Sequence, residues 1–127
     1  DEVRERVDTY RDAQAQANIS ADPNDIALTR PLLLATDESE RTALRESHLG
    51  TLEFLSASTS QSQDNPFYSD PDSRRERAEA GAILGTAAEC ISRLQQLEAF
   101  GVHQVLFTRT TPPVLRRFAA EVMPAFD

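Results

Sequence analysis

The chain has 127 residues, 39% of them hydrophobic, and a formal net charge of −8. This length and composition allow one packed domain and argue against wholesale disorder. All 13 basic residues are arginine, and the absence of lysine excludes Schiff-base catalysis and the lysine of a P-loop.

The charge balance also limits the partners of the chain. An acidic protein is poorly suited to nucleic acid or to an anionic membrane surface. No apolar run approaches the ~18 residues of a membrane span, and Asp1-Glu2-Val3-Arg4 does not resemble a signal peptide. We therefore expect a cytoplasmic protein with neither a nucleic-acid nor a membrane partner.

Few side chains are arranged for catalysis or metal binding. The single cysteine, Cys90, excludes an internal disulfide and a multi-cysteine zinc site. His48 and His103 are far apart in the sequence, and no carboxylate pair or catalytic triad stands out. We predict no catalytic residue and no metal ligand, and we expect Cys90 to be a buried, unreactive thiol.

The N-terminal half predicts a helix, a strand and a second helix. Residues 1–18 place apolar side chains at spacings of three and four, as in an amphipathic surface helix. Residues 26–35 are mostly apolar and predict a buried strand, in which Pro31 implies a bulge or a split. Residues 38–57 form the second helix, capped by Asp37.

The middle of the chain is polar. Residues 56–73 contain no Val, Ile, Leu or Met, and the whole segment 56–77 is predicted to be a polar loop or lid. Residues 74–82 are rich in arginine and glutamate and predict a short charged helix.

The C-terminal third has the clearest signals. Thr86 and Glu89 form a capping box that begins a helix, and Gly101 ends that helix. Residues 102–108 predict a strand, and Thr111-Pro112-Pro113 opens a last helix.

Strands that alternate with helices indicate an α/β fold with parallel strands. Two parallel strands are too few for a stable sheet, because parallel sheets need cover on both faces and usually more members. We therefore expect the chain to form part of a larger sheet, whose other strands lie upstream, on another copy, or outside these residues.

Three segments together resemble the C-terminal end of bacterial luciferase-like flavin-dependent monooxygenases: Ile83–Leu97, Phe100–Phe107 and Arg117–Phe126. Family members commonly read G-[TS]-P-E-E at the first segment, G-V-D-x-V/L-L-L at the second and F-A-E-E-V-M-P at the third. Ala87 replaces the usual proline, and His103-Gln104 occupy the strand entry. Upstream, the strand and Thr36-Asp37-Glu38 are also similar to the family.

The resemblance implies a (β/α)8 TIM barrel, which needs about 250 residues. Residues 1–127 would be its C-terminal segment, with strands seven and eight, their flanking helices and the lid 56–77. Barrel chemistry lies at the C-terminal strand ends, so the resemblance implies that Thr108 and Arg109 bind the flavin phosphate. The alternative is that Arg109 is a surface residue paired with an acid such as Glu121.

The function implied by the resemblance is an oxidoreductase that uses reduced FMN and oxygen to oxidise a small organic substrate. A relative that uses the deazaflavin F420 for hydride transfer is a close variant. The chain alone is expected to be inactive and to bind flavin weakly, and to form a homo-oligomer or to pair with the missing part of the barrel. The first alternative is a non-catalytic interaction module, and the second is an unrelated small α/β domain with further strands from 56–84.

Two further expectations concern single side chains. An exposed position on its helix is the commoner case for His48, although it could reach a substrate. Arg117 and Glu121, spaced i and i+4, are expected to pair on the surface of the last helix.

Overall fold

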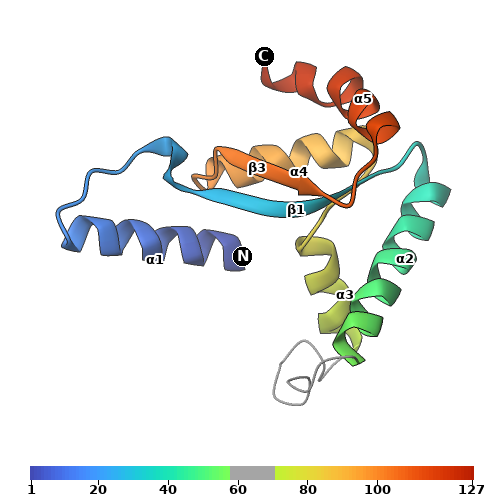
Figure 1. Cartoon of the computed structure of the whole chain (residues 1–127), viewed down its shortest axis with the longest axis horizontal. Coiled ribbons are helices and arrows are strands. Elements are labelled where there is room, and N and C mark those ends of the chain that lie inside the picture. The colour runs from blue at the N-terminus through green and yellow to red at the C-terminus, as the bar shows by residue number, and fades with distance from the viewer. Residues whose placement is uncertain (58–70) are drawn as a thin grey trace.

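The computed structural model describes residues 1–57 and 71–127, so residues 58–70 of the predicted polar loop 56–77 lie outside the described residues. Residues 71–77 were wrongly included in that loop, because they are helical. The described elements are, in chain order (Figure 1), the helices, strands and short 3-10 helices α1 (Glu2–Gln16), η1 (Pro23–Asp25), β1 (Ala27–Leu34), α2 (Glu38–Ala57), α3 (Pro71–Ala80), β2 (Ile83–Gly85), α4 (Ala87–Ala99), β3 (Gln104–Thr108), α5 (Pro112–Glu121) and η4 (Met123–Phe126).

The fold is α/β with an open parallel sheet in the order β2-β1-β3. Both predicted strands are present and are direct neighbours, as β1 and β3. The sequence-based count of two strands was incomplete, because Ile83–Gly85 forms a third strand, β2, against β1. Although β2 arises at the end of 56–84, it does not complete a self-contained sheet, since both outer edges remain unpaired among the described residues.

Pro31 does not interrupt β1, but the neighbours of β1 change there. Residues 27–31 of β1 pair with β3, and residues 32–34 pair with β2. The prediction of a bulge or a split at Pro31 was wrong, because β1 is continuous from Ala27 to Leu34 and only its neighbour changes. A residue without an N–H is tolerated where one side of the strand has no partner.

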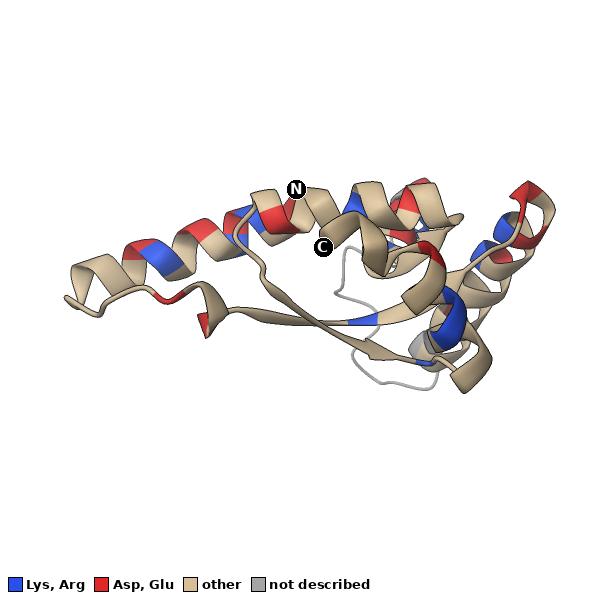
Figure 2. Ribbon diagram, turned by 90° about the horizontal axis from the view of Figure 1, so that it is seen from above, with Lys and Arg blue, Asp and Glu red and all other residues tan. Residues whose placement is uncertain are grey.

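The sheet is covered by helices on one face. Leu32, Leu34 and Ile83 belong to a buried core that includes Val7, Cys90, Leu97, Val102 and Val122. In the view of Figure 2, the N- and C-terminal helices lie on the same side of the strands.

The other face of the sheet is exposed. Thr29 and Leu106, which are register partners, both lie on it, and Leu106 is 55% exposed. A parallel sheet is normally covered on both faces. The uncovered face therefore marks this sheet as one section of a larger assembly of strands.

Helix beginnings follow the local sequence signals. Asp37 Oδ1 accepts a hydrogen bond from the N–H of Glu40 at 2.8 Å, which confirms the predicted cap of α2. At the start of α4, Glu89 Oε2 accepts the Thr86 N–H at 3.0 Å, which confirms the capping box.

Gly85 has φ = 137°, and a Cβ built there would lie 2.0 Å from Glu89 Oε2. We expect Gly85→Ala to lower the free energy of unfolding by about 2 kcal/mol, because it strains the backbone and displaces the capping carboxylate. Urea unfolding followed by circular dichroism measures the change.

Gly50→Ala is the matched control, because a Cβ at Gly50, within α2, meets nothing within 4 Å. It should raise the free energy of unfolding by about 1 kcal/mol through helix propensity. Equal effects of the two substitutions would contradict this account of Gly85.

Candidate functional site

The C-terminal ends of the three strands lie at the same edge of the sheet, because all strands are parallel. The residues that follow these ends are Ala35 and Thr36 after β1, Thr86 after β2, and Arg109 and Thr110 after β3. Open α/β sheets and barrels place their ligands at this edge. It is therefore the candidate functional site of the described structure.

The structure brings Arg109 and His48 together at this edge. Arg109 Nη1 lies 3.4 Å from His48 Nδ1, and His48 Nε2 lies 3.1 Å from the carbonyl oxygen of Ala78. A carbonyl only accepts and a guanidinium only donates, so both contacts require Nε2 to carry the proton and Nδ1 to accept. The geometry therefore assigns the neutral imidazole, with its proton on Nε2.

Burial and charge both favour this neutral form. Burial is the largest influence that lowers the pKa of His48, and the positive charge of Arg109 lowers that pKa further, while the hydrogen bond to Ala78 opposes them. Protonation of Nδ1 would direct an N–H at the guanidinium and break the contact.

The expectation of an exposed His48 was wrong, because the side chain is only 5% exposed. Contacts from Ala78 in α3 and Arg109 after β3 enclose it, and neither is near in sequence. The sequence does contain a signal: His48 is four residues from both Leu44 and Leu52, on the apolar stripe of α2.

The two residues assigned to the flavin phosphate are consecutive, and both are exposed. Thr108 is exposed at the end of β3, and Arg109 is exposed with φ = 55°, an uncommon backbone conformation for a residue with a Cβ. Thr110, the next residue, has a buried hydroxyl without a hydrogen-bond partner in the described part of the chain. Glu121 pairs instead with Arg117 at 3.4 Å, as predicted from their spacing.

A second interaction at this edge was missed by sequence reasoning. Arg41 Nε donates to Glu89 Oε2 at 2.8 Å, from a position 48 residues away, and this carboxylate raises the pKa of Arg41. The Glu89 carboxylate therefore places a negative charge at the N-terminus of α4 and accepts the Thr86 N–H. For this reason we do not assign an anion site to Gly85-Thr86.

Cys90 lies behind the same strand end and is fully buried. Burial raises the pKa of its thiol to about 11. The expectation of a buried cysteine is confirmed, and the raised pKa is consistent with an unreactive thiol.

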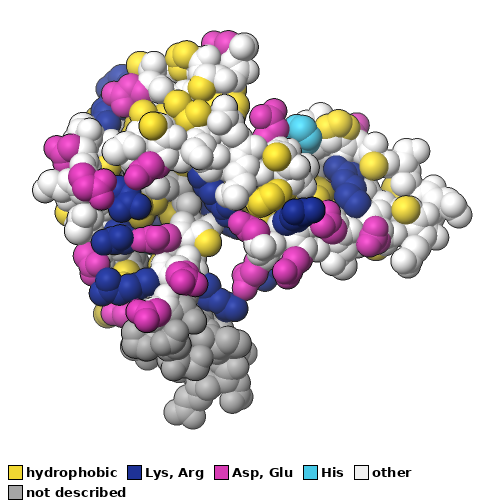
Figure 3. Space-filling view, turned by 180° about the vertical axis from the view of Figure 1, so that it is seen from behind, with side chains coloured by type: hydrophobic (Ala, Val, Ile, Leu, Met, Phe, Trp, Pro, Cys, Tyr) yellow, Lys and Arg dark blue, Asp and Glu magenta, His cyan; other side chains and the backbone are white. Residues whose placement is uncertain are grey.

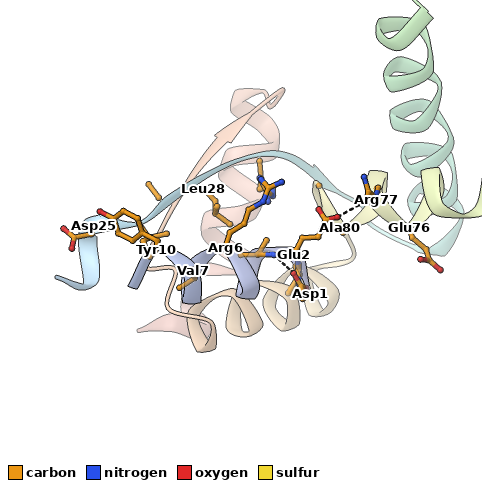
Figure 4. A pocket seen from close by; sticks show the side chains of 16 residues that line it. Asp1, Glu2, Arg6, Val7, Tyr10, Asp25, Leu28, Glu76, Arg77 and Ala80 are labelled. Atoms are coloured by element: carbon orange, nitrogen blue, oxygen red, sulfur yellow. Dashed lines mark hydrogen bonds and ion pairs between the residues drawn. The ribbon is translucent and has the colours of Figure 1, made fainter. Parts of the chain in front are cut away.

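A hollow lies away from the strand ends, against the first half of β1. It has a volume of about 660 Å³ and is bounded by residues of α1, β1, α3 and α4, among others. In the space-filling view from behind (Figure 3), arginine and acidic side chains surround a hollowed part of the surface. The residues that line the hollow (Figure 4) include four arginines and four acidic residues: Arg6, Arg30, Arg77, Arg93, Asp1, Glu2, Asp25 and Glu76.

Among residues 1–57 and 71–127, no group of three His, Cys, Asp or Glu side chains could hold a metal ion. Within the same ranges, no helix combines the length and the apolar character that crossing a membrane requires.

The fold and the site together define a section of an open α/β sheet whose carboxyl edge carries an exposed arginine. No known family model matches the sequence, and no curated protein matches it. The chain is similar in structure to monooxygenase RslO1 from Streptomyces bottropensis, with a TM-score of 0.71 and 21% sequence identity.

The alignment with RslO1 covers 98% of this chain and 38% of the RslO1 chain. The chain thus spans well under half the length of the protein that it matches. At this identity the likeness shows the fold alone. It confirms that the chain has the fold of one part of a larger monooxygenase, as the exposed sheet face also indicates.

The stability of the fold should depend on pH through His48. Its folded-state pKa is lowered from 6.5, so the unfolded chain binds the proton more readily. The stabilising contribution is complete above about pH 6.5 and declines as the pH falls below it towards the folded-state pKa. Urea unfolding at pH 7.5, 6.0 and 5.0 measures the loss.

His48→Gln should remove this dependence, because an amide can donate to Ala78 and accept from Arg109 without titrating. His103→Gln, at an exposed position, should retain it. A His48→Gln variant with the same pH profile as the unsubstituted chain would count against the buried neutral imidazole.

Proposed function

We propose that this chain is the C-terminal section of a luciferase-like flavin-dependent monooxygenase, which uses reduced FMN and oxygen to oxidise a small organic substrate. The observation that carries the proposal is the uncovered sheet face, and the match of the chain to 38% of the RslO1 chain supports it. The assignment of flavin chemistry comes from the three sequence segments that resemble the luciferase-like family.

In this proposal the larger fold is a (β/α)8 barrel, with β1 and β3 as its neighbouring strands seven and eight. The face that carries Thr29 and Leu106 would then line the barrel interior, while α1, α4 and α5 would belong to the outer ring. The carboxyl edge of the strands would open onto the active site, and residues outside 1–127 would supply the catalytic groups.

Arg109 and Thr108 would bind the phosphate of the flavin. Among the described residues, the side-chain partner of Arg109 is the neutral imidazole of His48 rather than a carboxylate, so its positive charge is not neutralised. A guanidinium forms strong, charge-assisted hydrogen bonds to phosphate, and the Thr108 hydroxyl adds a neutral donor. The same pair suits the phosphate of the deazaflavin F420. When bound, the flavin would supply the redox chemistry, and this chain would hold and orient it.

The test compares FMN with riboflavin, which lacks the phosphate. Flavin fluorescence titrations of the isolated chain should show weak binding, with FMN preferred over riboflavin. Arg109→Gln should reduce FMN affinity about tenfold and abolish the preference, because one charge-assisted hydrogen bond contributes about 1.5 kcal/mol.

Arg117→Gln is the control, since Arg117 lies on α5 and pairs with Glu121. It should leave both affinities unchanged. Equal affinity for FMN and riboflavin would contradict the phosphate assignment. Purification of the isolated chain with stoichiometric flavin would contradict its being an incomplete section.

A second candidate function is a non-catalytic interaction module derived from such a barrel. The uncovered sheet face, on which Leu106 is exposed, favours it, because parallel sheets are normally covered on both faces. This reading requires a homo-oligomer or a stable complex with a partner barrel. Light scattering that finds a folded monomer at high protein concentration would argue against self-association.

A further inference from the structure

His48 connects the exposed side chain of Arg109 to the interior of the fold. Its Nδ1 lies 3.4 Å from Arg109 Nη1, and its Nε2 lies 3.1 Å from the carbonyl oxygen of Ala78 in α3. His48 is 5% exposed and Ala78 is 3% exposed, so the imidazole is anchored among buried atoms. One donor of the Arg109 guanidinium is thereby tied to α3.

The helices on which His48 and Ala78 lie are joined to each other beside this contact. Two ion pairs connect α2 to α3, at 3.3 Å and 3.4 Å: Arg45 with Glu79, and Arg75 with Glu46. These charged groups are engaged with one another. Besides burial, which is the largest influence, the positive charge of Arg109 lowers the pKa of His48. The imidazole therefore has a defined place, and Arg109 is the cation that faces it.

The backbone of Arg109 is restricted separately from its side chain. Arg109 follows β3 directly, with φ = 55°, and α5 begins three residues later at Pro112. Phe107 of β3 packs edge to face on Phe118 of α5, with ring centroids 4.8 Å apart, so the elements on either side of Arg109 are in contact. The long side chain still has several rotatable bonds. Within the described residues, the contact with His48 restricts its charged end.

The acceptor in this contact carries no charge of its own. Arg41, by comparison, donates to the Glu89 carboxylate at 2.8 Å, which offsets its positive charge. The Arg109 guanidinium uses one N–H on the imidazole, and its other donors have no carboxylate partner within residues 1–57 and 71–127. Those donors suit the oxygens of a tetrahedral anion. Arg109 thus combines a restrained position with an unneutralised charge.

We propose that His48 is a positioning residue for the phosphate site, whose neutral imidazole holds the Arg109 guanidinium in place for a tetrahedral dianion. This rests on the proposed function in that Arg109 binds the flavin phosphate. His48 does not touch the anion, because it is buried and both of its ring nitrogens are engaged. Protonation of Nδ1 would release the guanidinium, so it would weaken anion binding even though it adds a positive charge.

Sulfate is the probe, because it is a tetrahedral anion that keeps both charges between pH 5 and pH 8 and carries no flavin ring. In NMR titrations at pH 7.5, sulfate should shift the backbone and side-chain N–H signals of Arg109. His48→Leu fills the buried position without an acceptor and should weaken sulfate binding about fivefold, as expected for the loss of one hydrogen bond. It should weaken FMN binding by a similar factor and leave riboflavin binding unchanged.

Two further substitutions separate position from charge. His48→Gln can still donate to Ala78 and accept from Arg109, so it should bind sulfate within about twofold of the unsubstituted chain. His48→Glu keeps an acceptor for Arg109 but adds a carboxylate that offsets its charge, and it should weaken sulfate binding at least about tenfold. His103→Gln, at an exposed position, is the control and should change nothing.

The unsubstituted chain supplies a test that does not depend on the folding of any variant. If the dianion binds better when His48 is neutral, bound sulfate must lower the pKa of His48, because the coupling is reciprocal. An effect of charge alone would raise that pKa. NMR titration of the imidazole in sulfate and in chloride at equal ionic strength distinguishes the two.

A pKa of His48 that rises in sulfate would overturn the proposal. So would sulfate binding by His48→Leu equal to that of the unsubstituted chain, or binding by His48→Gln as weak as that of His48→Leu. Each of these outcomes leaves the preference for FMN over riboflavin standing. Absence of both sulfate binding and that preference would instead remove the phosphate assignment, and the role of His48 with it.

Discussion

β1 pairs with two neighbours in succession, and this central strand joins the other two strands of the described sheet. Its first five residues pair with β3 and its last three with β2. The side chains that alternate towards the helices, Leu32 and Leu34 among them, join the buried core. Because the helices gather on that face, the opposite face stays open, and the strand ends lie at one edge with Arg109 and Thr86. The match of this chain to only part of a larger monooxygenase agrees with this open face.

The carboxyl edge contains two arginines with different electrostatic settings. Arg41 is paired with Glu89, which also caps α4, so this cation serves to join α2 to the start of α4. Arg109 contacts an imidazole that its surroundings keep neutral. A neutral acceptor positions the Arg109 guanidinium without a carboxylate that would offset its positive charge, so the guanidinium is better placed than Arg41 to bind an anion.

Local chemistry was sufficient to predict much of the fold. Caps such as Asp37 and the Thr86–Glu89 box depend on residues three positions apart, and they were predicted correctly. The strands at β1 and β3 are long enough for composition to identify them. β2 has only three residues, too few for a periodic pattern, and forms because Leu32 and its neighbours offer an edge.

The candidate site was harder to predict than the elements that carry it. Arg109 was located at a strand end by the topology that the sequence suggested, but its contact with His48 joins residues 61 positions apart. The burial of His48 depends on α3, whose place follows from the whole fold. The link between Arg41 and Glu89 is equally distant in sequence. Such contacts are set by packing, which a single sequence does not reveal.

The burial of Cys90 has a practical consequence for future work on this chain. Its thiol is fully enclosed and almost wholly protonated near neutral pH. A maleimide dye or a spin label added to the folded protein should therefore ignore it. A second cysteine introduced on an exposed position of α1 or α5 could be tagged selectively, and the distance between two such probes would report how the helices move when the sheet gains a neighbour.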